Sequence, residues 1–122
     1  MQWLAIIGLS VAGIIHILPV TGILGADQLT SLYGMKFGDP NLVILMRHRA
    51  VLFGILGVFL LFAAFKPDFQ LLAVIVGLVS VVSFLLLAGI GGGYSEAIGR
   101  VVKADLIALA GLIAAGVSVW LR

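Results

Sequence analysis

Four long apolar stretches, separated by short polar breaks, constrain the fold of this chain more than any other feature. The hydrocarbon core of a bilayer is roughly 30 Å thick, and a helix needs about 20 apolar residues to cross it. Four stretches reach that length, and we expect each to form a transmembrane helix, at about residues 3–24, 40–65, 69–90 and 96–121. The sequence therefore predicts an all-α integral membrane protein.

The composition supports the same class of protein. Hydrophobic residues make up 63% of the chain and charged residues only 10%, whereas soluble domains are about half apolar and about a quarter charged. The length fits a single domain over residues 1–122. A net charge of +2 is too small to indicate nucleic-acid binding, and the absence of cysteine excludes disulfides and thiolate metal sites.

The breaks between the stretches predict how the helices connect. Asp39 is suited to cap the second helix, with Pro40 at its first position, and Ser95 is suited to cap the fourth. Pro19 should kink the first helix, because proline removes a backbone hydrogen bond. Short breaks place consecutive helices side by side, so we expect an up-down-up-down, antiparallel four-helix bundle.

The longest break, residues 25–39, is too short to span a membrane. Residues 26–33 have the pattern of a short helix lying in the membrane interface. We expect Leu29, Leu32 and Tyr33 on that helix to dip into the headgroup region.

Small residues recur at helical spacing in every stretch. In a membrane, such residues let helix backbones approach one another, and we interpret these stripes as helix-packing surfaces. The stripes contain Ala5, Gly8 and Ala12 in the first stretch, Ala50, Gly54, Gly57 and Ala64 in the second, Ala73, Gly77 and Ser80 in the third, and Ala104, Ala108, Gly111 and Ala115 in the fourth.

Polar side chains interrupt the four stretches at a similar depth. With a rise of about 1.5 Å per residue, they lie roughly 10–14 Å from the membrane face that carries the 25–39 loop. Charged residues inside a membrane are costly and commonly functional, so this layer is where we expect a site. Its members, one from each helix, are His16, His48, Ser83 and Asp105.

Arg47 and Arg49 flank His48 and are predicted to face different ways. Arg47 lies on the small-residue stripe of the second stretch, so we expect it to point into the bundle. Arg49 is about 200° further round the helix, so we expect it to reach the lipid headgroups. Asp105 is the natural ion-pair partner of Arg47, because an unpaired charge at this depth would be costly.

These placements define a predicted ligand site and a set of lipid anchors. Arginine binds carboxylates and phosphates through charge-assisted hydrogen bonds. We therefore expect a binding or accessory protein whose site takes an amphiphile with an anionic or carbonyl head, such as a lipid or a quinone. The expected ligand-binding residues are Arg47, His16, Asp105, Ser83, Arg100 and His48, and the expected headgroup anchors are Arg49, Lys103 and Tyr94.

Other interpretations stay open from the sequence alone. Arg47 and Asp105 can instead form a structural clasp, and His16 can be a core histidine bonded to Ser83 or to a backbone carbonyl. His16 and His48, at one depth, could hold a haem in a redox-accessory subunit of a membrane oxidoreductase. The chain could also be a structural subunit of a larger or homo-oligomeric membrane complex. The P-loop, G-x-S-x-G and H-E-x-x-H motifs are absent, which disfavours an enzyme.

The distribution of Lys and Arg bears on orientation. The positive-inside rule favours the more basic face in the cytoplasm, which puts both termini outside. Setting aside the two arginines within the second stretch leaves three basic residues against two, which decides nothing. The face with the 25–39 loop carries Lys36, Arg47, Arg49, Arg100 and Lys103, and the opposite face carries Lys66 and Arg122.

Four short stretches carry a likeness that spans nearly the whole chain: residues 13–19, 32–34, 46–54 and 103–106. In these stretches the chain resembles small bacterial inner-membrane proteins of the four-helix, DoxX-like kind. This resemblance implies a multi-pass protein of the bacterial inner membrane. It also implies an association with membrane oxidoreductases and quinone-linked electron transfer. The count of basic residues, separately, favours termini on the periplasmic side.

Overall fold

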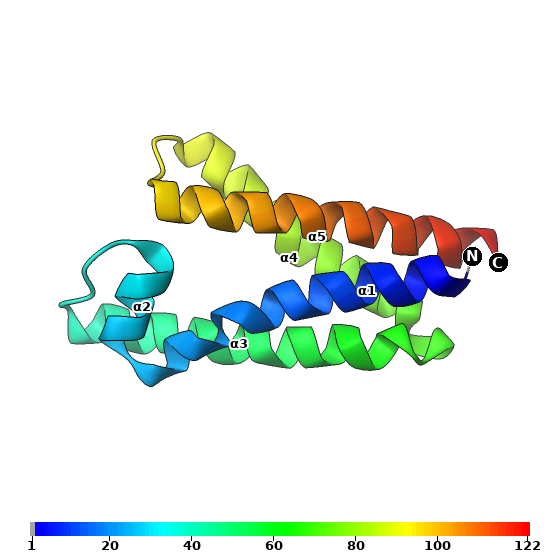
Figure 1. The fold of residues 1–122 in the computed structure, drawn as a ribbon, viewed down its shortest axis with the longest axis horizontal. Helices are drawn as coiled ribbons and strands as arrows, with labels where there is room; N and C mark the ends of the chain where they lie inside the picture. The colour runs from blue at the N-terminus through cyan, green and yellow to red at the C-terminus, as the bar shows by residue number, and fades with distance from the viewer. Residues whose placement is uncertain (1) are drawn as a thin grey trace.

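The computed structural model describes residues 2–122, and all regular secondary structure in that range is helical (Figure 1). The helices are α1 (Gln2–Ile17), the 3₁₀ helix η1 (Leu18–Leu24), α2 (Ala26–Tyr33), α3 (Pro40–Ala64), α4 (Pro67–Gly91) and α5 (Glu96–Leu121). Four segments are long and apolar enough to cross a membrane: α1 with η1, α3, α4 and α5. The predicted all-α, four-helix membrane fold is confirmed.

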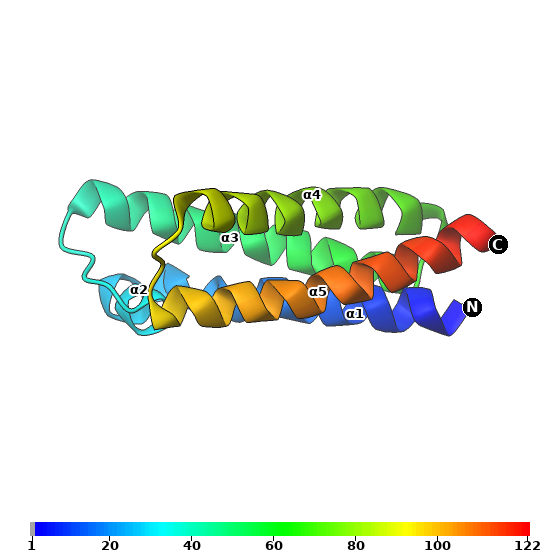
Figure 2. The ribbon, with the colours of Figure 1, turned by 90° about the horizontal axis from the view of Figure 1, so that it is seen from above.

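The four long helices form an antiparallel bundle in which each packs against two neighbours. Helix α1 lies against α3 and α5, and α4 packs on the same two helices from the other side, so α3 and α5 are diagonal to each other. Figures 1 and 2 show that α1 begins and α5 ends at the same end of the bundle. This is the up-down-up-down arrangement that short connections produce.

The helices begin where the capping residues predict. The Asp39 carboxylate accepts a hydrogen bond from the backbone N–H of Asn41 at 2.9 Å, which satisfies a free donor at the start of α3. The Ser95 hydroxyl accepts in the same way from the Ile98 N–H at 3.3 Å, at the start of α5. These local signals position the two helices that carry half of the charged residues, six of twelve.

Pro19 changes the first span from an α-helix into a 3₁₀ helix rather than simply kinking it. Proline has no N–H to continue the α-helical hydrogen-bond ladder, and α1 ends at Ile17, two residues earlier. The 3₁₀ helix η1 then packs against α3 and α2, and within the described chain it makes no close backbone contact with α5. The first span therefore leaves α5 near the loop-rich end of the bundle.

Glycine pairs hold α1 close to its two neighbours. A Cβ added at Gly111 would lie 2.9 Å from the carbonyl oxygen of Gly8, and one at Gly57 would lie 2.8 Å from the carbonyl oxygen of Gly13. No side chain fits at such distances, so only glycine allows α1 to approach α5 and α3 this closely. The interpretation of the small-residue stripes as packing surfaces is confirmed at these crossings.

Helix α2 caps the loop-rich end of the bundle, and its apolar face is turned toward the protein. Leu29 is 1% exposed and Tyr33 is 6% exposed, and both pack with side chains of α3 and α5. Gly34 ends α2 in the left-handed conformation at φ 70°, and a Cβ on it would lie 2.7 Å from Cβ of Ala97 in α5. The prediction that Leu29 and Tyr33 dip into the headgroups is wrong, because the bundle buries them.

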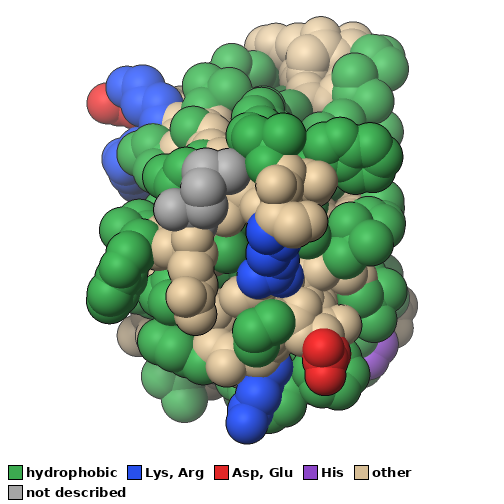
Figure 3. Space-filling view, turned by 90° about the vertical axis from the view of Figure 1, so that its right-hand side faces the viewer, with side chains coloured by type: hydrophobic (Ala, Val, Ile, Leu, Met, Phe, Trp, Pro, Cys, Tyr) green, Lys and Arg blue, Asp and Glu red, His purple; other side chains and the backbone are tan. Residues whose placement is uncertain are grey.

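The flanks of the bundle are covered by large exposed hydrophobic side chains, as the end-on view in Figure 3 shows. They come from every long helix, for example Ile7 (57% exposed), Ile55 (63%), Leu87 (70%) and Ile107 (59%). Apolar surface of this extent is rare on soluble monomers and suits contact with lipid. The protein is therefore a multi-pass membrane protein whose helices face the bilayer.

Candidate functional site

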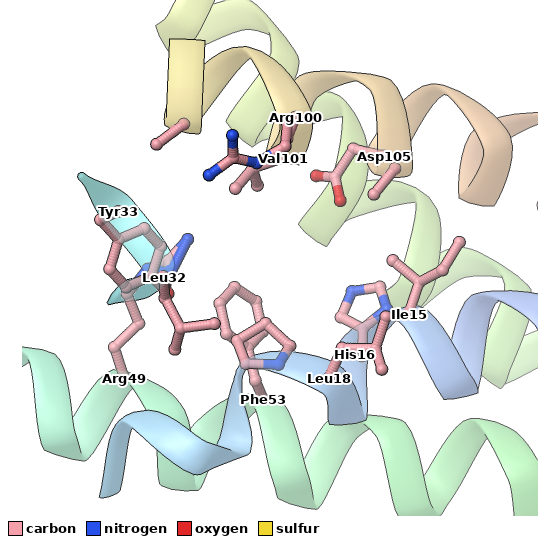
Figure 4. Close-up of a pocket in the computed structure, with 13 residues that line it drawn as sticks. Ile15, His16, Leu18, Leu32, Tyr33, Arg49, Phe53, Arg100, Val101 and Asp105 are labelled. Carbon is pink, nitrogen blue, oxygen red and sulfur yellow. Dashed lines mark hydrogen bonds between the residues drawn. The ribbon is translucent and has the colours of Figure 1, made fainter. Parts of the chain in front are cut away.

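A cavity of about 210 Å³ opens near the loop-rich end of the bundle, between η1 and α5 (Figure 4). Its apolar wall includes Ile15, Leu18, Leu32, Phe53 and Val101. Its polar groups are His16 from α1, Tyr33 from α2, Arg49 from α3, and Arg100 and Asp105 from α5. Of the predicted ligand-binding residues, His16, Arg100 and Asp105 lie at this cavity, while Arg47, His48 and Ser83 do not.

The cavity exists because the first span leaves α5 at Pro19. Toward the termini, the Gly8–Gly111 contact holds α1 against α5. Beyond Ile17 the chain follows α3 instead, and α3 is diagonal to α5 in the bundle, so no helix fills the space between them. The interruption at Pro19 thus ends the close contact between the first span and α5, and the cavity lies where that contact would have continued.

His16 is a buried and fully hydrogen-bonded side chain, 4% exposed. Its Nδ1 lies 2.8 Å from the Ala12 carbonyl oxygen, which can only accept, so Nδ1 is the donor. In the neutral imidazole, Nε2 then accepts from the Ser80 hydroxyl at 2.9 Å on α4. The ring also packs edge-on against Phe53, with centroids 5.6 Å apart. The interpretation of a core histidine bonded to a carbonyl is confirmed.

Ser80, and not Ser83, is the serine that reaches the polar layer. The Ser83 side chain is exposed, and its hydroxyl donates to the Ser80 carbonyl oxygen of its own helix at 3.0 Å. The buried face of α4 is marked by Gly77 and Val81, and the helical rotation carries Ser83 further from that face than Ser80. The prediction that Ser83 binds ligand or His16 is wrong. Ser83 was selected by its distance from the end of the helix, and its direction around the helix axis was not considered.

Arg49 occupies the inward position that the sequence predicts for Arg47. Its Nη1 donates to the Tyr33 hydroxyl at 3.2 Å, and its guanidinium lies over the Phe53 ring, 4.2 Å from the centroid. Stacking and hydrogen bonding together hold the planar guanidinium in one orientation at the cavity wall. Arg49 is therefore a residue of the candidate site, and its prediction as a headgroup anchor is wrong.

Arg47 is exposed and lies outside the cavity. Its Nε donates to the Ile23 carbonyl oxygen of η1 at 2.7 Å, and within residues 2–122 it forms no ion pair with Asp105. The small-residue stripe misplaced it, because Gly54 packs against Val20 of η1 and not against the bundle centre: a Cβ there would lie 3.2 Å from Val20. The predicted Arg47–Asp105 pair is wrong, both as a site and as a clasp.

Asp105 and Arg100 project from α5 into the cavity. Asp105 is half-buried, and within the described chain no hydrogen bond reaches its carboxylate. Arg100 is exposed at the cavity mouth, and Figure 4 shows its guanidinium and the Asp105 carboxylate directed into the space between α5 and η1. Arg49 is the cation whose charge acts on Asp105. The site is thus a hollow with two positive groups and one negative group.

Tyr33 and Phe53 are site residues that the sequence analysis missed. Tyr33 is buried against Phe37, with ring centroids 6.3 Å apart, and its hydroxyl accepts from Arg49. Burial raises the pKa of the Tyr33 phenol, and the nearby positive charge of Arg49 partly offsets this. Phe53 follows Arg49 by four residues and shares its helix face, a spacing that could have indicated the stack.

The two histidines do not form a pair. His48 is exposed and does not line the cavity, and both nitrogens of His16 already have hydrogen-bond partners. The arrangement therefore does not fit a haem held by these two residues. Lys103 and Tyr94 are also exposed, near the loop-rich end of α5, and their role as headgroup anchors stays a prediction.

A second cavity of about 240 Å³ lies beside the first, lined by Met35, Phe37, Leu42, Met46, Phe84 and Ile98. Tyr33 and Arg49 line both cavities. The hydrogen-bonded Tyr33–Arg49 pair therefore forms part of the wall between them.

The fold and this site together define a class: a four-helix, multi-pass membrane protein with a charged cavity near one end of the bundle. Comparison with protein-family models, with curated proteins and with solved structures finds no match to the chain. The resemblance to DoxX-like proteins stays a prediction.

Proposed function

We propose that this protein binds an amphiphile with an anionic or carbonyl head, such as a lipid or a quinone. The observation that supports the proposal is the pair of arginines, Arg49 and Arg100, on a cavity whose wall is otherwise mainly aliphatic and aromatic. A guanidinium carries five N–H donors, and the one bond from Arg49 to Tyr33 leaves others for a ligand. In a water-poor cavity such charge-assisted bonds are stronger than in water.

The two arginines are suited to different tasks. Arg49 is held by Tyr33 and Phe53, so little side-chain entropy is lost when a ligand binds to it. Arg100 is exposed at the mouth and can follow an incoming head group. A fixed inner cation and an exposed outer one together suit capture of a head that carries negative charge.

The tail of the amphiphile would extend along the outer surface of the bundle. A cavity of about 210 Å³ accommodates a head group but not a whole membrane lipid. Leu18 at the rim is 61% exposed, and the neighbouring Ile14 is 53% exposed, so the edge of the opening is aliphatic. Entry from the bilayer between η1 and α5 therefore keeps the tail in contact with apolar surface throughout.

The experiment is native mass spectrometry of the protein extracted with its own lipids. We expect the wild type to retain an amphiphile, and Arg49→Ala and Arg100→Ala to lower its occupancy by roughly tenfold, the scale of one charged hydrogen bond. Arg47→Ala is the matched control, since it removes the same charge two residues away but outside the cavity. Equal loss in all three variants would overturn the proposal in favour of general charge effects.

We further infer that the protein resides in a bacterial inner membrane with both termini on the periplasmic side. The resemblance to DoxX-like proteins and the basic residues near the 25–39 loop support this placement. Reporter fusions at the C-terminus that are active only in the periplasm test it. Activity of a cytoplasmic reporter at that end would reverse the orientation.

A further inference from the structure

Asp105 is a charged group of the cavity that has no contact to make with a ligand head group that binds only to Arg49 and Arg100. It lines the cavity, is half-buried, and within residues 2–122 receives no hydrogen bond. A carboxylate only accepts hydrogen bonds. A head made solely of acceptors, such as a bare phosphate or a quinone carbonyl, would bring its own negative charge or lone pairs toward this carboxylate. Such a contact is repulsive in a medium of low dielectric constant.

The charges in the cavity are separated along its length. Asp105 follows Arg100 by five residues on α5, which is about 7–8 Å along the helix axis. Figure 4 shows Arg49 and Arg100 on the side of Tyr33, and Asp105 on the side of His16. His16 cannot donate to Asp105 without giving up its bond to Ala12 or Ser80. The cavity thus has a positive side toward α2 and a negative side toward α1.

We infer that the ligand head carries a hydrogen-bond donor as well as an acceptor: the acceptor binds Arg49 and Arg100, and the donor binds Asp105. This inference rests on the proposed function and specifies its ligand class. A primary ammonium and a hydroxyl both supply the required donor, as in ethanolamine and glycerol phospholipid heads. A quaternary choline head does not, because its nitrogen has no hydrogen.

The cleanest test compares two zwitterionic lipids that differ in this one property. Delipidated full-length protein in detergent is titrated with phosphatidylethanolamine or with phosphatidylcholine of the same acyl chains, and binding is followed by native mass spectrometry. We expect the wild type to bind the ethanolamine lipid roughly tenfold more tightly, the size of one hydrogen bond to a charged group. Phosphatidylglycerol, titrated in parallel, shows whether a hydroxyl can replace the ammonium.

Variants of Asp105 tie the preference to the carboxylate. In Asp105→Ala the two lipids should bind equally well, because the ethanolamine ammonium no longer has the carboxylate to which only it can donate. Asp105→Asn keeps an acceptor oxygen and the side-chain size but removes the charge, so it also covers the case in which the alanine variant fails to fold. The donor of the ethanolamine head is an ammonium, so removing the charge of its acceptor should reduce the preference in Asp105→Asn well below its wild-type size. An undiminished preference in that variant overturns the inference.

Failure of this inference and failure of the proposed function give different results. Equal binding of both lipids by the wild type, with both reduced in Arg49→Ala, overturns the donor requirement and leaves the arginine site standing. Binding that no Arg49 or Arg100 substitution alters overturns both. A preference for phosphatidylethanolamine that survives in Asp105→Ala and in Asp105→Asn assigns the donor contact to another group and also overturns the inference.

Discussion

The two ends of the bundle use buried polar groups in opposite ways. Near the termini, the helices meet at the Gly8–Gly111 contact around a core that includes Leu9, Leu60 and Leu112, each 0% exposed. At the loop-rich end, η1 leaves α5 and a cavity lined with charge takes the place of such a core. The half of the bundle near the termini is therefore filled by continuous helix contacts. The loop-rich half contains a cavity because the first span is interrupted there.

Gln70 illustrates the role of polar groups in the filled half. It is 1% exposed, and its Nε2 donates to the Ala64 carbonyl oxygen at 3.0 Å, where α3 has just ended. This bond satisfies a carbonyl that the last turn of a helix leaves without a partner. Asp105, in the hollow half, has no such backbone partner among the described residues. Gln70 therefore stabilises the end of a helix through its Nε2, while its Oε1 has no partner among the described residues. The Asp105 carboxylate instead faces the cavity, where a ligand can reach it.

The largest expected effect is a loss of stability from a substitution in the filled half, the half near the termini. Gly8→Val places a side chain against the Gly111 carbonyl, so α1 and α5 must separate. We expect the free energy of unfolding in detergent to fall by about 3 kcal/mol or more, the upper range for overpacking. Thermal or denaturant unfolding followed by circular dichroism measures this. Gly89→Val is the control, because a Cβ there meets nothing within 4 Å; equal losses in both variants would contradict the close-contact explanation.

The next effect concerns the polar bond at the border of the two halves. Ser80→Ala leaves Nε2 of the buried His16 without a partner, so we expect a loss of about 1–3 kcal/mol in unfolding free energy. Ser83→Ala, whose hydroxyl bonds only its own helix, should change stability by less than about 0.5 kcal/mol. The same unfolding measurement applies. A larger loss in Ser83→Ala than in Ser80→Ala would restore the original prediction for Ser83.

A smaller effect distinguishes Arg49 from Arg47 by their energetic coupling to Asp105. In double-mutant cycles on stability, Arg49→Ala with Asp105→Ala should show a coupling of about 0.5 kcal/mol or more, because the charge of Arg49 acts on Asp105. Arg47→Ala with Asp105→Ala should be additive, because Arg47 bonds to η1 and not to α5. Coupling with Arg47 alone would show that the two arginines have been assigned to the wrong faces.

The smallest effect is spectroscopic and sharpens the description of the hollow half. Burial raises the pKa of Tyr33 above its ordinary value of 10.0, so its phenol should ionise only at higher pH. The chain has two tyrosines, so a Tyr94→Phe background leaves Tyr33 as the sole phenol for an absorbance titration at tyrosinate wavelengths. Because the folded-state pKa is the higher one, this group should stabilise the fold below pH 10.0 and progressively less as the pH rises further. Titration below pH 10.0 would show that Tyr33 is not buried.

The sequence predicted the fold well because its signals are local. Spans 40–65 and 96–121 needed only the apolar run and a capping residue, and the observed helices Pro40–Ala64 and Glu96–Leu121 agree to within one residue. The candidate site was predicted in part. The depth estimate grouped His16 with Asp105, and the structure places both at the same cavity. Rotation about each helix axis was less certain, and Arg47, Arg49 and Ser83 were misplaced for that reason.

The sequence by itself determined which segments are long and apolar enough to cross a membrane, and how far along each helix the charges lie, because run length and the rise per residue do not depend on neighbours. Only the tertiary structure decided which charge faces inward. That choice depends on the partner helix that each face meets: the Gly54 face meets η1, so Arg47 lies outside, while the Phe53 and Leu60 face meets the interior and carries Arg49 with it.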